Sequence, residues 1–110
     1  IETFVILWPH VKDGGIYIVE DVQTSYWPSY GGGPLGTPGY EKSCMRWFKE
    51  IADSVNLPEF LQPAPGRLDA GIGSIAFHHN LIVLKKDLAA RYSNMPLDDP
   101  GARQRLMQPG

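Results

Sequence analysis

The sequence predicts an α/β domain, and three observations carry this prediction. A helical pattern of apolar residues closes on Gly14 and Gly15, and a short run of β-branched residues follows directly. The strongly amphipathic segment 41–56 predicts a second helix. The apolar segment 74–86 indicates two strands joined by a tight turn. The order helix, strand, helix and hairpin is typical of an α/β sheet that contains one reversed strand.

The first helix and strand are predicted from spacing and turn residues. Residues 2–11 place apolar side chains at helical spacing, and Pro9 should bend or end that helix because it has no backbone N–H to donate. Gly14 or Gly15 is then free to take a positive φ angle where the helix stops. The segment 16–22 is rich in β-branched residues and bounded by turn signals, so we expect a strand there.

A long loop and the second helix follow. The 18 residues of segment 23–40 include five glycines and three prolines, which predict a loop, and a loop this long is usually functional or disordered. The helix at 41–56 carries one apolar stripe opposite a charged face. We expect this stripe to pack into the core rather than to hold a ligand, and to bury Trp47, Phe48 and Ile51.

The hairpin contains a pair of histidines. The chain should turn near His79 and Asn80, because asparagine tolerates the left-handed backbone region. His78 and His79 are adjacent in the predicted strand, so their side chains should face opposite sides of the sheet. A metal ion shared by these two histidines is therefore not expected.

Composition and charge exclude several classes of protein. A chain of 110 residues has room for one domain with one modest core. A net charge of -2 gives no basic surface for nucleic acid, and no apolar run approaches the roughly 20 residues that cross a membrane. Cys44 is the only cysteine, so we expect a buried reduced thiol and no intrachain disulfide. A reducing, cytoplasmic setting is the expectation.

The first candidate site is the acid pair Glu20 and Asp21, at the end of the predicted strand. In open α/β sheets, ligands bind beyond the carboxyl ends of the strands. Adjacent residues of a regular strand face opposite sides, so both carboxylates can meet one ion only if the strand breaks between or just before them. Converging carboxylate oxygens suit a hard cation such as Mg²⁺. The alternative is that both acids are simply solvated.

The second candidate site is the loop that follows the acids. Tyr26 and Trp27, together with Tyr30, offer flat rings that can pack on a sugar or another flat ligand. The alternative is that these rings hold the loop onto its own domain. The glycine run 31–33 would let the backbone move as a lid.

Two stretches carry a resemblance to a known family. They are residues 7–33, "LWPHVKDGGIYIVEDVQTSYWPSYGGG", and residues 74–86, "SIAFHHNLIVLKK". Together they resemble the C-terminal half of class I S-adenosylmethionine-dependent methyltransferases. Within that class they look most like the magnesium-dependent sugar O-methyltransferases of macrolide biosynthesis. The most specific part is a helix closing on Lys-x-Gly-Gly, a strand ending in Glu-Asp, then Thr-Ser-Tyr-Trp-Pro and a glycine run.

The resemblance implies the C-terminal part of a Rossmann-like sheet, made of its fifth to seventh strands with the last one antiparallel. The strand at 81–86 should then lie antiparallel beside 16–22, with the first hairpin strand at the outer edge. Residues 1–86 would form the C-terminal half of a methyltransferase domain, and residues 87–110 a short helical segment and a mobile tail. The family's donor-binding strands, a further aspartate ligand and the catalytic histidine have no counterpart in this sequence. No catalytic or donor-binding residue is assigned, and the isolated chain is expected to be inactive.

The implied reaction is methyl transfer from S-adenosylmethionine to a hydroxyl of a sugar or another small molecule, assisted by Mg²⁺. On this resemblance Glu20 and Asp21 are metal ligands, and Tyr26 and Trp27 line the acceptor pocket. Two alternatives stay open: a cephalosporin-hydroxylase-like enzyme on the same scaffold, and a non-catalytic half-domain that serves as an interaction module. Without a neighbouring strand on its far side, the segment 16–22 would have an unpaired edge, so we expect self-association through these residues.

Overall fold

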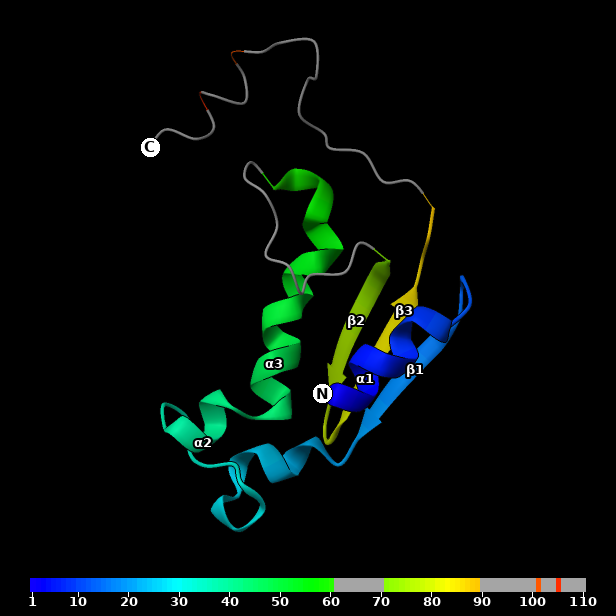
Figure 1. Ribbon diagram of the computed structural model, residues 1–110. Coiled ribbons are helices and arrows are strands. Elements are labelled where there is room, and N and C mark those ends of the chain that lie inside the picture. The colour runs from blue at the N-terminus through cyan, green and yellow to red at the C-terminus, as the bar shows by residue number, and fades with distance from the viewer. Residues whose placement is uncertain (61–70, 90–100, 102–104, 106–110) are drawn as a thin grey trace.

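The computed structural model describes residues 1–60, 71–89, 101 and 105. The described part contains one sheet and a group of helices packed against it (Figure 1). In chain order its elements are α1 (Glu2–Leu7), the 3-10 helix η1 (Trp8–His10), β1 (Ile16–Glu20), the 3-10 helices η2 (Val22–Tyr26) and η3 (Pro28–Tyr30), α2 (Pro38–Glu41), α3 (Cys44–Ile51), the 3-10 helix η4 (Ala52–Glu59), β2 (Ile72–His78) and β3 (Leu81–Lys86).

The three strands lie in the order β1-β3-β2, and both pairs are antiparallel. A tight turn joins β2 to β3, with Asn80 in the left-handed region at a φ of 61°. Val83 in the middle strand lies opposite Ile18 on one side and opposite Ala76 on the other. The expected order is confirmed, because the second hairpin strand lies beside β1 and the first lies at the outer edge.

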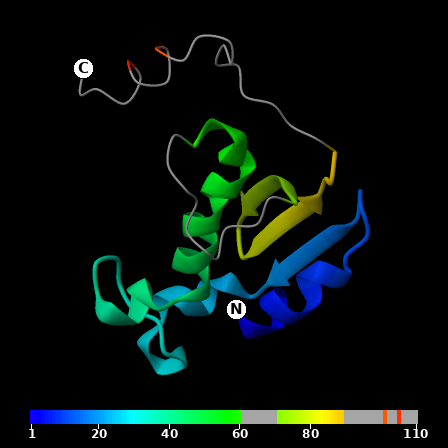
Figure 2. The same cartoon turned by 45° about the horizontal axis from the view of Figure 1, so that its top comes forward.

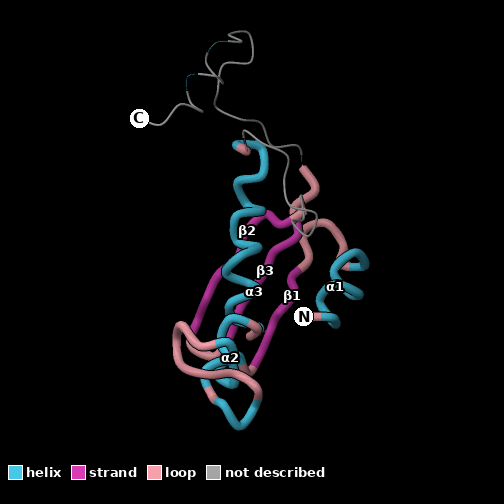
Figure 3. Tube along the Cα trace, turned by 60° about the vertical axis from the view of Figure 1, so that its left-hand side comes forward, coloured by secondary structure: helices cyan, strands magenta, loops and turns pink. Residues whose placement is uncertain are grey.

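One face of the sheet is covered by helices α1 and α3, as the turned views show (Figures 2 and 3). The Phe4 ring of α1 packs edge-on against Tyr17 of β1 and Phe48 of α3, with centroid distances of 5.1 Å in both pairs. Ile82 and Leu84 of β3 complete this face and are fully buried. The full core cluster is Phe4, Trp8, Val22, Phe48, Ile51, Ile72, Ile82 and Leu84.

The first helical segment is shorter than the 2–11 expected. The α-helix ends at Leu7, and Trp8–His10 continue as a 3-10 turn with Pro9 near its start. This is the bend that proline was expected to cause. Gly14 then takes a φ of 78° and donates its N–H to the Lys86 carbonyl over 2.9 Å.

The second helical segment is split, which the single helix predicted at 41–56 did not anticipate. Ser43 interrupts it and caps α3, its Oγ accepting the N–H of Arg46 at 3.2 Å. Phe48 and Ile51 are buried as expected, but the prediction was wrong for Trp47, which is only half-buried. The Trp47 ring packs edge-on against Phe48 at the margin of the helix's apolar stripe.

Other expectations are corrected at the ends of elements. The strand β1 stops at Glu20 rather than residue 22, and segment 23–40 contains short helical turns instead of plain loop. His79 lies in the hairpin turn and not in a strand. Most of the tail predicted at 87–110 lies outside the described residues. None of the helices in the described part combines the length and apolar character that crossing a bilayer requires.

Candidate functional site

The acid pair sits at an abrupt break in the backbone. Strand β1 ends at Glu20, and Asp21 takes φ 59° and ψ 38°, which is the left-handed conformation. Few residues other than glycine adopt it readily, although aspartate is among them. The strand therefore breaks between the two acids, as one ion shared by both would require.

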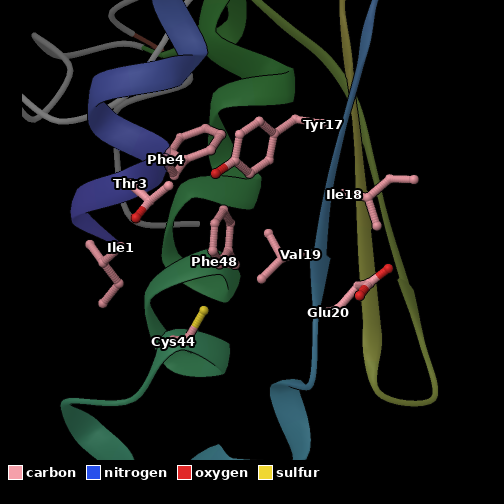
Figure 4. A pocket seen from close by; sticks show the side chains of 9 residues that line it. All are labelled: Ile1, Thr3, Phe4, Tyr17, Ile18, Val19, Glu20, Cys44 and Phe48. Carbon is pink, nitrogen blue, oxygen red and sulfur yellow. The ribbon is translucent and has the colours of Figure 1, made fainter.

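Glu20 projects from the strand on the side away from the helices. Figure 4 shows Tyr17 and Val19 pointing toward α1 and α3, while Ile18 and Glu20 point to the opposite face. This is the alternation that a regular strand imposes. Both Glu20 and Asp21 are exposed to solvent, so neither carboxylate bears the desolvation cost of a buried charge.

Short-range hydrogen bonds hold the turn at Asp21. The Thr24 hydroxyl donates to the Asp21 carbonyl at 3.1 Å, and the Gln23 amide donates to Asp21 Oδ1 at 3.4 Å. Serine and threonine hydroxyls commonly stabilise turns in this way. The carboxylate oxygens of Glu20 accept no hydrogen bond from the described residues and are free for another ligand.

Glu20 and Asp21 can supply two of the ligands of a magnesium ion. No group of three histidine, cysteine, aspartate or glutamate side chains that could hold a metal occurs in the described ranges. Magnesium is usually held by one or two carboxylates together with water and substrate oxygens, so it does not need a third side chain from this chain. The donor set of Glu20 and Asp21 suits such an ion, and none of the histidines joins them.

The aromatic loop lies directly after the acids. Tyr26 stacks on Tyr40, with ring centroids 5.7 Å apart and planes at 21°, and Trp27 lies 5.9 Å from Tyr30 at 50°. Tyr40 is only 4% exposed, whereas Tyr26 is 39% and Trp27 48% exposed. One face of the Tyr26 ring therefore holds the loop to the domain, and the rest of the ring stays accessible to a ligand. Holding the loop and packing on a ligand are thus compatible roles for this residue.

The glycines of the loop are needed for close packing. A Cβ added to Gly32 would fall on the Ser25 carbonyl, and one added to Gly39 would fall on the Gly32 carbonyl, both well under the 3.0 Å that real Cβ atoms respect. Gly33 donates its N–H to the Ser25 carbonyl at 3.0 Å. Gly31 is different, because it takes a φ of 87° with open space around it. The glycine run therefore packs the loop closely against itself, and the lid movement expected from the sequence stays a prediction.

A cavity of about 200 Å³ lies between α1, β1 and α3 (Figure 4). Phe4, Val19 and Phe48 form the apolar part of its wall, and Glu20 borders it although the Glu20 side chain points to the other face of the sheet. Cys44 also lines it, and burial raises the pKa of this thiol above its ordinary value. Cys44 is half-buried and not fully buried as expected, because it lies at the rim of the core in the first turn of α3. A protonated thiol is a weak nucleophile, which agrees with an inert cysteine.

Two residues that support the loop were not predicted. The buried Ser25 accepts the N–H of Met45 on its Oγ at 3.1 Å, which ties η2 to the first turn of α3. The ring of Tyr40 stacks against the ring of Tyr26 on the side that faces the domain. Neither position has a sequence signal, because each contact joins segments more than a dozen residues apart.

No protein-family model matches the chain. Among curated proteins, it is 35% identical over 88 residues to demethylmacrocin O-methyltransferase of Streptomyces fradiae, and 31% identical over 86 residues to mycinamicin VI 2''-O-methyltransferase of Micromonospora griseorubida. Each alignment covers 76% of this chain and 22% of the relative. A tetracenomycin-C rhamnosyl 2'-O-methyltransferase of Streptomyces olivaceus is 33% identical over 93 residues, which are 78% of this chain and 23% of that protein.

Solved structures agree with the sequence relatives. The methyltransferase MycE of the mycinamycin pathway, in complex with Mg, SAH and mycinamycin VI, matches with a TM-score of 0.66 and 26% identity. The match covers 96% of this chain and 28% of that one. A second MycE structure, with Mg and SAH, gives a TM-score of 0.67 at 27% identity, covering 94% of this chain and 28% of that one.

The chain thus spans about a fifth of these curated relatives and just over a quarter of the MycE chain. The α/β fold expected from the sequence is confirmed, and so is the resemblance stated for its two motif stretches. Over about three quarters of its length, the chain is a homologue of the sugar O-methyltransferases of macrolide and tetracenomycin biosynthesis.

Proposed function

We propose that this chain forms the metal-binding and acceptor-binding part of an S-adenosylmethionine-dependent O-methyltransferase that modifies a hydroxyl of a sugar. The observation that carries the proposal is the break of β1 at Asp21, which puts two exposed carboxylates directly before the aromatic loop. The name of the Streptomyces olivaceus relative supports a sugar hydroxyl as acceptor, because it describes a 2'-O-methyltransferase for a rhamnosyl compound.

In this proposal Glu20 and Asp21 hold a magnesium ion with help from water and from oxygens of the acceptor. When bound, the ion orients the acceptor and lowers the pKa of its hydroxyl. Tyr26 and Trp27 pack on the acceptor and hold it against the carboxylates. Fixing the acceptor in this way removes much of the entropic cost of bringing it to the methyl donor.

The donor-binding half of such an enzyme is expected on a Rossmann-like sheet beyond this chain. The chain alone should then be inactive, because we assign neither a donor site nor a general base to its described residues. A cytoplasmic setting stays part of the proposal, since a chain with a single cysteine forms no intrachain disulfide and suits a reducing compartment.

The free edge of β1 is proposed as a pairing surface. Among the described strands β1 pairs only with β3, so its other edge has no partner. Ile16 and Ile18 on this strand are exposed. An apolar strand with an unpaired edge readily pairs with another strand, so the isolated chain should associate with itself through residues 16–22.

The test uses a protein in which residues 1–110 are extended by the sequence encoded upstream. Methyl transfer from S-adenosylmethionine to a sugar-bearing acceptor should require Mg²⁺ and stop on adding a chelator. Asp21→Asn should weaken the apparent affinity for Mg²⁺ at least about tenfold, the scale found when even the partners of metal ligands are changed.

The matched control for this test is Asp53→Asn, because Asp53 is an equally exposed aspartate on η4, away from the strand end. This control should leave the magnesium dependence as it is. If Asp21→Asn also leaves it unchanged, Asp21 is not a metal ligand.

A further inference from the structure

The face of the Tyr26 ring that meets the domain rests on a single buried aromatic residue. Tyr40 stacks beneath it at 5.7 Å with nearly parallel planes, and Tyr40 is itself 4% exposed. Tyr26 is the last residue of the 3-10 helix η2, whose buried residues are Val22 and Ser25, and its own ring stacks on Tyr40. The direction of its ring therefore depends on Tyr40.

Tyr40 is held by contacts to its side chain, its backbone N–H and its carbonyl. The Lys49 ammonium donates to the Tyr40 hydroxyl at 3.2 Å and lies 5.7 Å from the centre of its ring. The N–H of Tyr40 reaches Thr37 Oγ1 at 3.5 Å, which caps α2, and its carbonyl accepts the N–H of Ser43 at 2.8 Å. Tyr40 thus links the loop to α3, and a ring fixed at this depth is a rigid base for another ring.

We propose that Tyr40 is a positioning residue, which holds the ring of Tyr26 in the orientation that the sugar acceptor requires. The inference rests on the proposed role of Tyr26 in acceptor binding. Tyr40 does not touch the acceptor itself, because it is covered by the domain. A sugar packs on an aromatic face only when that face is presented at the correct angle, so loss of Tyr40 weakens acceptor binding and leaves donor binding alone.

The experiment measures kcat and the separate KM values for acceptor and donor in the upstream-extended protein. Tyr26→Ala and Tyr40→Met should each raise the acceptor KM about three- to tenfold, the factor that corresponds to the energy of one aromatic pair. Methionine fills the buried volume with a flexible apolar chain but offers no flat face. Tyr40→Phe keeps the ring and should leave the acceptor KM unchanged. The donor KM should stay constant throughout.

The double variant distinguishes positioning from general damage. If Tyr40 acts through Tyr26, the pair Tyr26→Ala and Tyr40→Met raises the acceptor KM no further than Tyr26→Ala alone. Tyr17→Leu is the control, because it removes an aromatic contact from the core far from the loop and should leave the acceptor KM as it is.

Three results would overturn the inference. An unchanged acceptor KM in Tyr40→Met, together with a raised one in Tyr26→Ala, rejects the role of Tyr40 and leaves the acceptor role of Tyr26 standing. An unchanged acceptor KM in Tyr26→Ala rejects that acceptor role itself, and the inference with it. Should Tyr40→Met not fold, Tyr40→Leu takes its place with the same expected result, and a raised acceptor KM in Tyr40→Phe would show that the ring is not what matters.

Discussion

Replacing Gly32 with alanine should displace the aromatic loop, whereas the same change at its neighbour Gly31 should not. The added methyl at position 32 would fall on the Ser25 carbonyl, which is already fixed by the N–H of Gly33 at 3.0 Å. Real Cβ atoms stay at least 3.0 Å from such an atom, so one of the two backbone segments must move. Gly31 has nothing within 4 Å of an added Cβ, and the cost there is only that of its positive φ.

The magnitude follows from these two situations. Overpacking a close contact costs typically about 1–3 kcal/mol. An alanine at positive φ costs about 1–2 kcal/mol for the backbone conformation alone. Both variants should therefore lose stability to a similar degree, and only Gly32→Ala should also shift the loop. For an extended domain of about 150–250 residues, about 2 kcal/mol corresponds to a fall in Tm of roughly 4–8 °C.

The assay combines thermal unfolding with amide and indole NMR spectra of the upstream-extended protein. In Gly32→Ala the signals of Ser25, Trp27 and Tyr30 should shift, while in Gly31→Ala only the immediate neighbours of Gly31 should. Identical spectra for residues 25–30 in the two variants would refute the close-packing explanation of the glycine run. A gain in stability in both would instead favour the flexible lid, because alanine reduces the freedom of an unfolded or mobile backbone.

Two further predictions concern the cysteine and the strand edge. Because burial raises the pKa of Cys44, the folded state keeps a proton that the unfolded state loses above about pH 8.5, so the free energy of unfolding should fall as pH rises through that region. Urea titrations should show this fall between pH 8 and 9.5 and show less of it in Cys44→Ala, and an equal fall in both would assign it to other groups. For the strand edge, Ile18→Lys should reduce self-association of residues 1–110 in sedimentation velocity, because a charge on an exposed edge strand opposes pairing. Ile6→Lys removes another exposed isoleucine, from α1, and an equal effect there would show that association does not use β1.

The order of the strands and the position of the acids could be predicted from the sequence because both depend on local patterns. Alternating β-branched residues mark β1, and Asn80 marks the turn that puts β3 beside it. The break at Asp21 was expected only as a condition for metal binding. Its cause is local as well, since aspartate tolerates the left-handed region and Thr24 closes the turn.

What the sequence did not reveal depends on contacts between distant segments. Lys86 ends a strand, where a lysine is normally solvated, yet it is buried with its ammonium donating to the Trp8 carbonyl at 3.0 Å and lying 4.7 Å from the Trp8 ring centre. Trp47 was expected in the core but lies at its side, because α1 supplies Phe4 to the centre. The stacking of Tyr26 on Tyr40 is another contact that the sequence did not reveal, since no periodicity relates the two positions.

The most direct test of the account is calorimetric titration of S-adenosylmethionine into residues 1–110 and into the same chain extended upstream. We predict no detectable binding to residues 1–110 and clear binding to the extended protein, because the donor site is expected on strands that this chain lacks. The isolated chain should also be marginally stable, since three short strands and a small core leave little to offset the entropy of ordering. A folded monomer of residues 1–110 that binds the methyl donor at micromolar concentration would contradict the account, and these residues would then contain a donor site of their own.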